Sequence, residues 1–191
     1  MASRANFSVP MFRPPRKPLR PGRWALTLLV GSSVCAAIAQ AGCGASSAPG
    51  VVRGPQTDFA LGQVPASWRR IHVSDAQLAY RDDALEATAA VNARCGKDAD
   101  DVPLEALRRQ LFIYFTDREV EHEERLQLDG REALKTVLRA RLDGVPQGFV
   151  VYVLKKDGCV YDFMYITDPR TLQEGQAAFD RFVLGFRTIA R

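Results

Sequence analysis

The chain has 191 residues, 47% of them hydrophobic and 25% charged, and a formal net charge of +4. The first 42 residues hold six basic and no acidic residues, which leaves 20 basic and 22 acidic residues, a net charge of −2, in the other 149. A chain of 149 residues makes one ordinary domain. Without a basic excess or stripe, it lacks the electrostatic footprint of a nucleic-acid-binding protein, and we expect no nucleic-acid partner.

The beginning of the chain has the pattern of an export signal. Nineteen uncharged, mostly apolar or small residues run up to Cys43. They are preceded by six basic residues: Arg4, Arg13, Arg16, Lys17, Arg20 and Arg23. A charged region, an apolar region and a small-residue exit together are typical of a secretory signal, so residues 1–42 are predicted to be a signal peptide. Met11 is an alternative start of translation.

The end of this leader, Gln40-Ala41-Gly42-Cys43, resembles a bacterial lipobox. Gln40 departs from the family pattern, which has Leu or another aliphatic residue there. The resemblance implies cleavage between Gly42 and Cys43 by lipoprotein-processing enzymes, with a diacylglycerol on the Cys43 sulfur and hence a lipid anchor in a membrane. Ala39-Gln40-Ala41 is also an A-x-A site that would release a soluble periplasmic or secreted protein. An uncleaved anchor is a third interpretation, because nineteen apolar residues just span a ~30 Å hydrocarbon core.

Residues 43–63 are rich in Gly, Ser, Ala and Pro and are predicted to be a flexible tether ahead of a single globular domain at 64–191. Gly44 follows the cysteine. In bacteria that resemble the enteric ones, a residue other than Asp there implies the outer membrane, with the protein facing the periplasm.

The domain is predicted to begin with three strands, near 68–73, 77–81 and 85–93, where short runs of residues alternate in polarity. Asp101 and Pro103 then indicate the start of a helix. Its apolar stripe is formed by Leu104, Leu107, Leu111 and Tyr114. Residues 116–124 are acidic, which indicates a solvated loop or the edge of a strand.

Three Asp-Gly pairs, at 129–130, 143–144 and 157–158, separate the following apolar runs. Asp-Gly between apolar runs is a strong hairpin signal, so four strands are predicted near 125–128, 131–142, 147–155 and 159–166. The second of these also fits a helix, but its flanking turns favour a strand. The last two are apolar throughout and are predicted to be central strands covered on both faces.

A terminal helix is predicted from Thr171-Leu172-Gln173-Glu174, which has the pattern of a capping box. Its apolar face is formed by Leu172, Phe179, Phe182, Val183 and Phe186, which we expect to lie on the sheet.

Cysteine usage leaves one pair for the exported domain, Cys95 and Cys159, because Cys35 lies in the signal and Cys43 is the lipid site. An even remainder in an oxidising compartment favours a disulfide. Two reduced cysteines, buried separately, are the alternative. No metal site is expected, because His72 and His122 lack the short ligand spacings of a zinc site.

This order of elements resembles the PsbP-like fold, which photosystem lumenal proteins share with bacterial envelope lipoproteins such as the DcrB and mycobacterial LpqN groups. The resemblance covers residues 65–187 and rests on Trp68, on the hairpin at Asp157-Gly158 and on Phe179, Phe182 and Phe186. It implies an α+β sandwich, an antiparallel sheet of six to seven strands with one mid-chain and one C-terminal helix. It also implies binding or accessory roles at membranes, and it brings no catalytic residue.

No nucleophile elbow, phosphate-binding glycine loop or Cys-x-x-Cys is present, so we expect neither an enzyme nor a cofactor. The predicted function is that of a lipid-anchored accessory protein of an envelope transport or secretion complex, with an envelope protein as partner. Alternatives are a periplasmic carrier of a small apolar ligand and, less favoured, a hydrolase. An exposed apolar patch beside residues 117–124 would favour the accessory protein. An enclosed cavity lined by Phe112, Tyr152 or Phe163 would favour the carrier.

Overall fold

The computed structural model describes residues 50–96 and 102–190. The chain divides into two units, Met1–Cys43 and Gly44–Arg191, and every described residue belongs to the second. The elements of this unit, in chain order, are β1 (Val51–Arg53), β2 (Asp58–Ala60), β3 (Trp68–Ile71), β4 (Leu78–Asp82), β5 (Ala87–Cys95), α1 (Leu104–Gln110), β6 (Thr116–Leu128), β7 (Arg131–Leu142), β8 (Val145–Lys156), β9 (Cys159–Thr167), α2 (Leu172–Leu184) and β10 (Arg187–Ile189).

Seven of these strands form an antiparallel sheet in the order β3-β4-β5-β9-β8-β7-β6. The predicted α+β fold class is confirmed, and residues 131–142 form a strand, as their flanking turns indicated. At each of the three Asp-Gly pairs both residues have positive φ, as a two-residue type I′ hairpin turn requires. β6 begins at Thr116, so the acidic segment is part of the outermost strand of the sheet.

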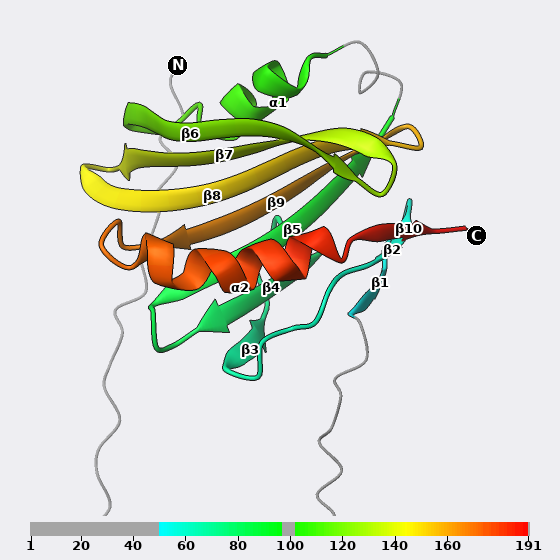
Figure 1. Cartoon of the computed structure of the whole chain (residues 1–191), viewed down its shortest axis with the longest axis horizontal. Coiled ribbons are helices and arrows are strands. Elements are labelled where there is room, and N and C mark those ends of the chain that lie inside the picture. Colours follow the sequence, from blue (N-terminus) through cyan, green and yellow to red (C-terminus); the bar gives the residue numbers. More distant parts are fainter. Residues whose placement is uncertain (1–49, 97–101, 191) are drawn as a thin grey trace, which may run out of the picture. The chain divides into compact units, whose positions relative to one another are not determined.

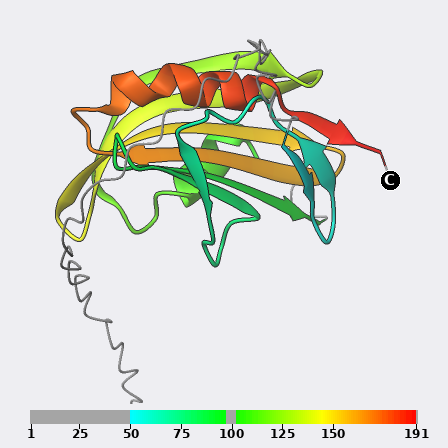
Figure 2. The ribbon, with the colours of Figure 1, turned by 90° about the horizontal axis from the view of Figure 1, so that it is seen from below.

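The two helices pack on opposite faces of the sheet (Figure 1). Successive residues of β8 alternate between two apolar clusters: Val150 and Tyr152 belong to the cluster beneath α2, while Phe149 and Val151 belong to the cluster beneath α1. Figure 2 shows α2 lying along its face of the sheet. Because both faces are covered, the run from Gly148 to Leu154 is buried throughout, as predicted for a central strand.

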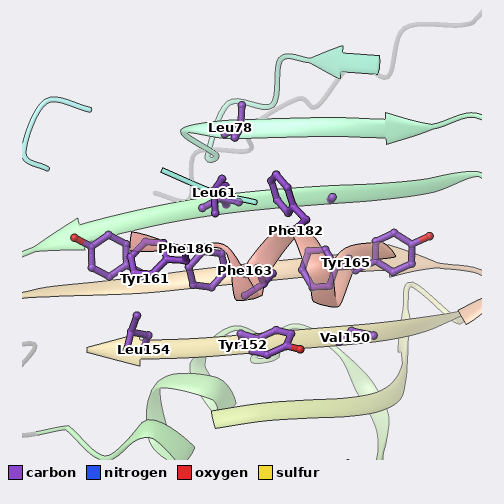
Figure 3. Packing of buried hydrophobic residues seen from close by; sticks show 14 of the residues in the cluster. Leu61, Leu78, Val150, Tyr152, Leu154, Tyr161, Phe163, Tyr165, Phe182 and Phe186 are labelled. Carbon is purple, nitrogen blue, oxygen red and sulfur yellow. The ribbon is translucent and has the colours of Figure 1, made fainter. Parts of the chain in front are cut away.

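Aromatic rings from α2 and β9 fill the larger cluster (Figure 3). The Phe182 ring packs edge-on against Trp68 with 5.5 Å between ring centroids, and the Phe186 ring lies 4.8 Å from that of Tyr161. Such edge-to-face contacts add stability beyond that of buried area alone. The aromatic residues predicted for the terminal helix therefore hold α2 on the sheet.

A second, three-stranded sheet is formed by β1, β2 and β10, with β2 in the middle. The prediction of a flexible tether over residues 43–63 is therefore wrong from Val51 onward, whereas 43–49 lie outside the described residues. Phe59 and Leu61 are fully buried, and the Phe59 ring contacts those of Tyr161 and Phe186. A few apolar residues within a Gly- and Pro-rich segment thus close one end of the core.

Three helix predictions need correction. α2 ends at Leu184 and Gly185 follows it, so Phe186 lies beyond the helix, although its ring still packs on Tyr161. α1 ends at Gln110, so Tyr114 lies beyond the helix and is 85% exposed; Asp101 lies outside the described residues. Thr171 makes no side-chain cap on α2. Its hydroxyl instead donates to the Asp168 carbonyl oxygen (3.2 Å) and lies 2.9 Å from the Thr167 hydroxyl, so it is bonded to the preceding turn and not to the helix.

Candidate binding surfaces at the two ends of the sheet

The hairpin turns define two ends of the seven-stranded sheet. The turns after β6 and β8 lie at one end, together with the disulfide, and we call this the disulfide end. The turn between β7 and β8 lies at the other end, which we call the hairpin end. In both views of the ribbon the three-stranded sheet and the β7–β8 turn are far apart (Figures 1 and 2). The two ends therefore offer separate surfaces.

Cys95 closes β5 and Cys159 opens β9, and the two are directly paired in the register of these strands. They form the predicted disulfide. Beside it is a surface pocket of about 450 Å³ between the β1–β2 segment and β10. The Gln56 amide oxygen accepts a hydrogen bond from the Cys95 N–H (3.2 Å), so the disulfide end is also tied to the three-stranded sheet.

An exposed apolar surface lies at the hairpin end, on the α1 face of the sheet. We call it the apolar patch, and it consists of Ile113 (67% exposed), Tyr114 (85%), Val120 (45%), Leu142 (41%) and Val145 (55%). Leu142 pairs with Val145, and Val120 pairs with Leu138, a buried member of the cluster beneath α1. The patch therefore continues that cluster to the surface, because the short helix α1 ends before it covers this end of the sheet.

The acidic side chains of β6 are held mostly in ion pairs with neighbouring elements. Glu121 pairs with Arg139 of β7 (2.5 Å), Glu123 with Arg108 of α1 (3.2 Å), and Glu124 with Lys135 of β7 (3.3 Å). These pairs bind the edge strand to β7 and α1. In the described part of the chain no group of three or more His, Cys, Asp or Glu side chains is arranged to hold a metal ion.

Both histidines lie at the surface. His122 is on β6, and its Nε2 lies 3.8 Å from a Glu124 carboxylate oxygen. His72 directly follows β3 and is exposed. They belong to different edges of the sheet, because β3 and β6 are its two outermost strands. The structure does not bring them together.

A partly buried polar network, which the sequence analysis did not predict, links α2 to the sheet. The Tyr152 hydroxyl donates to one Asp180 carboxylate oxygen (2.7 Å), and the Lys135 ammonium donates to the other (3.0 Å). Burial and the hydrogen bond to Asp180 raise the pKa of Tyr152. Each group has a partner, so we interpret the network as a structural link between β7, β8 and α2.

Phe112, Tyr152 and Phe163 do not line one common space. Phe112 belongs to the cluster beneath α1, whereas Tyr152 and Phe163 belong to the cluster beneath α2. All three are almost fully buried against neighbouring side chains. These residues therefore do not form the enclosed apolar cavity that was expected of a ligand carrier.

Gly42 and Cys43, the predicted cleavage and lipidation residues, lie outside the described residues. Among the residues that the structure does describe, no helix is both long enough and apolar enough to cross a membrane.

No protein-family model matches the sequence, and no curated protein matches it either. Solved structures do match. Cyanobacterial PsbP (CyanoP) from Synechocystis superposes with a TM-score of 0.56 at 15% identity, over 78% of this chain and 96% of CyanoP. LpqN, involved in cell envelope biogenesis of Mycobacterium tuberculosis, gives a TM-score of 0.53 at 14% identity, over 75% of this chain and 91% of LpqN.

This chain has the PsbP-like fold. The yeast Ran-binding protein Mog1p is also similar, with a TM-score of 0.50 at 13% identity, over 68% of this chain and 89% of Mog1p. At such low identities the likeness establishes the shared fold, and a fold of this kind hosts unrelated functions. The expected fold group is thus confirmed, while the function has to be argued from the surfaces of this chain.

Proposed function

We propose that this chain is a lipid-anchored protein of the bacterial cell envelope that binds a protein partner through its apolar patch. It would serve as an accessory component of a membrane-associated transport or secretion complex and would catalyse no reaction. The observation that carries this proposal is the patch itself, where Ile113, Tyr114, Leu142 and Val145 are each exposed at the hairpin end of the sheet. Contiguous apolar side chains of this kind mark interaction sites on soluble domains.

The position of the patch relative to the proposed anchor favours a protein as its partner. Gly50, the first described residue, lies against Tyr80 and Val64, which pack on the cluster beneath α2. Cys43 is seven residues earlier, and seven residues reach at most about 25 Å. A membrane that holds Cys43 would thus lie nearer the α2 face, and the patch on the α1 face would be turned toward other proteins.

The composition of the patch also fits a protein interface. Tyr114 offers a large ring with a polar hydroxyl, and aromatic residues of this type are enriched at interfaces. The patch is bordered by Arg118 and by Arg141, whose guanidinium donates to the Gly144 carbonyl oxygen (2.8 Å). An apolar centre with a polar rim is the usual anatomy of a protein interface. The envelope role of LpqN, which has the same fold, is compatible with this location.

A photo-crosslinking experiment in living cells tests the proposal. Benzoylphenylalanine replaces Tyr114 in the patch or, as a control, exposed Arg70 on β3 at the opposite edge of the sheet. We expect one discrete protein adduct from position 114 and none from position 70. With the identified partner purified, Ile113→Ser together with Tyr114→Ser should weaken binding about tenfold or more, which is about 1.4 kcal/mol. Equal adducts from both positions, or adducts with phospholipid alone, would contradict the proposal.

A further inference from the structure

A cluster of basic side chains lies at the disulfide end, away from the apolar patch. Arg131 opens β7, and Lys155 and Lys156 close β8. These three side chains line a surface pocket of about 420 Å³ together with Asp157 and Gly158. A neighbouring pocket of about 310 Å³ shares Arg131 and Lys155. The two pockets therefore adjoin each other at Arg131 and Lys155.

The acidic groups near this surface are occupied by particular cations. Glu105 and Glu132 both pair with Arg125, which lines the smaller pocket. Lys156 lies 3.5 Å from Asp129, whose carboxylate also accepts hydrogen bonds from Thr188.

Arg131 differs from these cations. Within residues 50–96 and 102–190 it forms no ion pair with a carboxylate, and it is exposed. Of the groups lining the larger pocket, three are cationic and one is anionic. Lys156 pairs with Asp157 (3.9 Å) as well as with Asp129, so Arg131 is the cation of this pocket that has no carboxylate partner among the described residues.

We propose that the pocket of about 420 Å³ binds a phosphate group, held chiefly by the Arg131 guanidinium, with Lys155 and Lys156 lining the same pocket. A guanidinium binds two phosphate oxygens at once, and an ammonium adds a point charge, so this combination suits phosphate better than a single carboxylate. A volume of several hundred Å³ accommodates a phosphate together with a small organic group attached to it.

The phosphate could come from a lipid headgroup or from a small soluble molecule. The first source rests on the proposed lipid anchor. The three-stranded sheet, which contains the first described strand, adjoins this same end through the hydrogen bonds between Asp129 and Thr188. A membrane holding Cys43 would then lie closer to the basic pocket than to the apolar patch.

The experiment uses the purified chain carrying Cys43→Ala, which has no lipid of its own, so that a failure of the proposed anchor does not affect it. Sodium phosphate is titrated at constant ionic strength, with chloride as the balancing anion, and binding is measured by calorimetry. Arg131→Gln with Lys155→Gln should weaken phosphate binding at least tenfold. The matched control is Arg109→Gln with Arg118→Gln, which removes the same charge near the hairpin end and should leave binding unchanged.

Two further measurements distinguish a lipid headgroup from a soluble molecule as the source of the phosphate. Binding to phosphatidylglycerol vesicles but not to phosphatidylcholine vesicles, lost in the Arg131 and Lys155 variant, supports the headgroup. Phosphate binding without vesicle binding supports a soluble phosphate ester and overturns the membrane source. Absence of phosphate binding, or equal loss in both double variants, overturns the site. Thermal unfolding without ligand verifies that the variants fold, and Arg131→Gln alone replaces the double variant if it does not.

Discussion

Asp162 shows at the residue scale how the sheet changes the chemistry of a side chain. It lies in β9 among apolar strands and is only 4% exposed, and Arg94 Nη2 is 2.9 Å from its carboxylate. Burial raises the pKa of Asp162 to about 6, and the attraction of Arg94 opposes this only in part. The ionised carboxylate therefore destabilises the folded state relative to the protonated one.

This pKa gives a pH dependence with a definite sign. Because the pKa is higher in the folded chain than in the unfolded chain, stability should fall as pH rises from about 4 to about 6 and then stay level. A shift of about two units corresponds to roughly 3 kcal/mol. Asp162→Asn should remove this dependence. In urea unfolding, the free energy of unfolding of the variant should therefore rise relative to that of the parent chain between pH 4.5 and pH 7.

Asp168 provides the control for this measurement. Hydrogen bonds from Arg170 lower the pKa of Asp168 to about 2, so its contribution is present at neutral pH and is lost only as pH falls through its folded value. Asp168→Asn should therefore differ from the parent chain by the same amount at pH 5 and at pH 7. A constant difference for Asp162→Asn over that range would disprove the assignment of the raised pKa.

At the scale of elements, the close approach of α2 to β9 depends on a glycine. A Cβ built at Gly175 would lie 1.8 Å from the Tyr165 hydroxyl oxygen, which is nearer than any real contact. The Tyr165 ring is fully buried and packs 5.4 Å from the Phe179 ring, so it has little room to move. Gly175 thus lets the helix lie on the aromatic layer of the sheet.

Gly175→Ala tests this contact by setting two effects against each other. Alanine favours a helix over glycine by about 1 kcal/mol, but overpacking a core costs typically 1–3 kcal/mol. We expect a net loss of about 1–2 kcal/mol in chemical denaturation. Tyr165→Phe removes the nearest clashing atom, the hydroxyl oxygen, which has no hydrogen-bond partner among the described residues. The ring carbons Cζ and Cε1 would still lie 2.5 and 2.9 Å from the new Cβ, so the double variant should recover only part of the loss. Additive effects of the two changes would contradict a direct clash.

At the scale of the whole molecule, the described residues form a seven-stranded sheet, two helices and a three-stranded sheet, and they present two separate surfaces. The apolar patch lies at the hairpin end on the α1 face, and the basic pocket lies at the disulfide end beside the small sheet. The first described strand begins at Val51, eight residues after Cys43, so a lipid on Cys43 would hold the domain close to the membrane. The two proposals thus assign one end to the membrane and the other to a protein partner.

Intact-mass measurement tests the proposed anchor and the disulfide of the whole chain. We expect chain extracted from membranes to begin at Cys43, to carry the mass of a diacylglycerol, and to gain about two daltons on reduction of the Cys95–Cys159 disulfide. Cys43→Ala should lose the lipid and keep the disulfide. A soluble chain that begins at Gly42 would contradict the anchor but would leave the phosphate site open to its own test.

Local patterns in the sequence predicted much of the fold. The three Asp-Gly pairs predicted the hairpins, because Asp and Gly tolerate the positive φ angles of a two-residue turn. A turn of this length also fixes the register in which the two flanking strands pair. The alternating and continuous apolar runs predicted the central strands, and Phe179 and Phe182 identified a terminal helix that packs on them. The sequence alone also predicted the Cys95–Cys159 pair, since only two cysteines remained for the domain.

Only the tertiary structure decided which residues lie close together across strands and which remain exposed. It brought Phe59 and Leu61 from an apparently flexible segment into the core, where burial against Phe186 overrides the local composition. It also placed Arg131, Lys155 and Lys156 around one pocket, although Arg131 begins β7 and the two lysines end β8. Burial and cross-strand contacts are long-range properties. Local patterns therefore determined the elements of this protein, whereas its binding surfaces arose from how those elements pack.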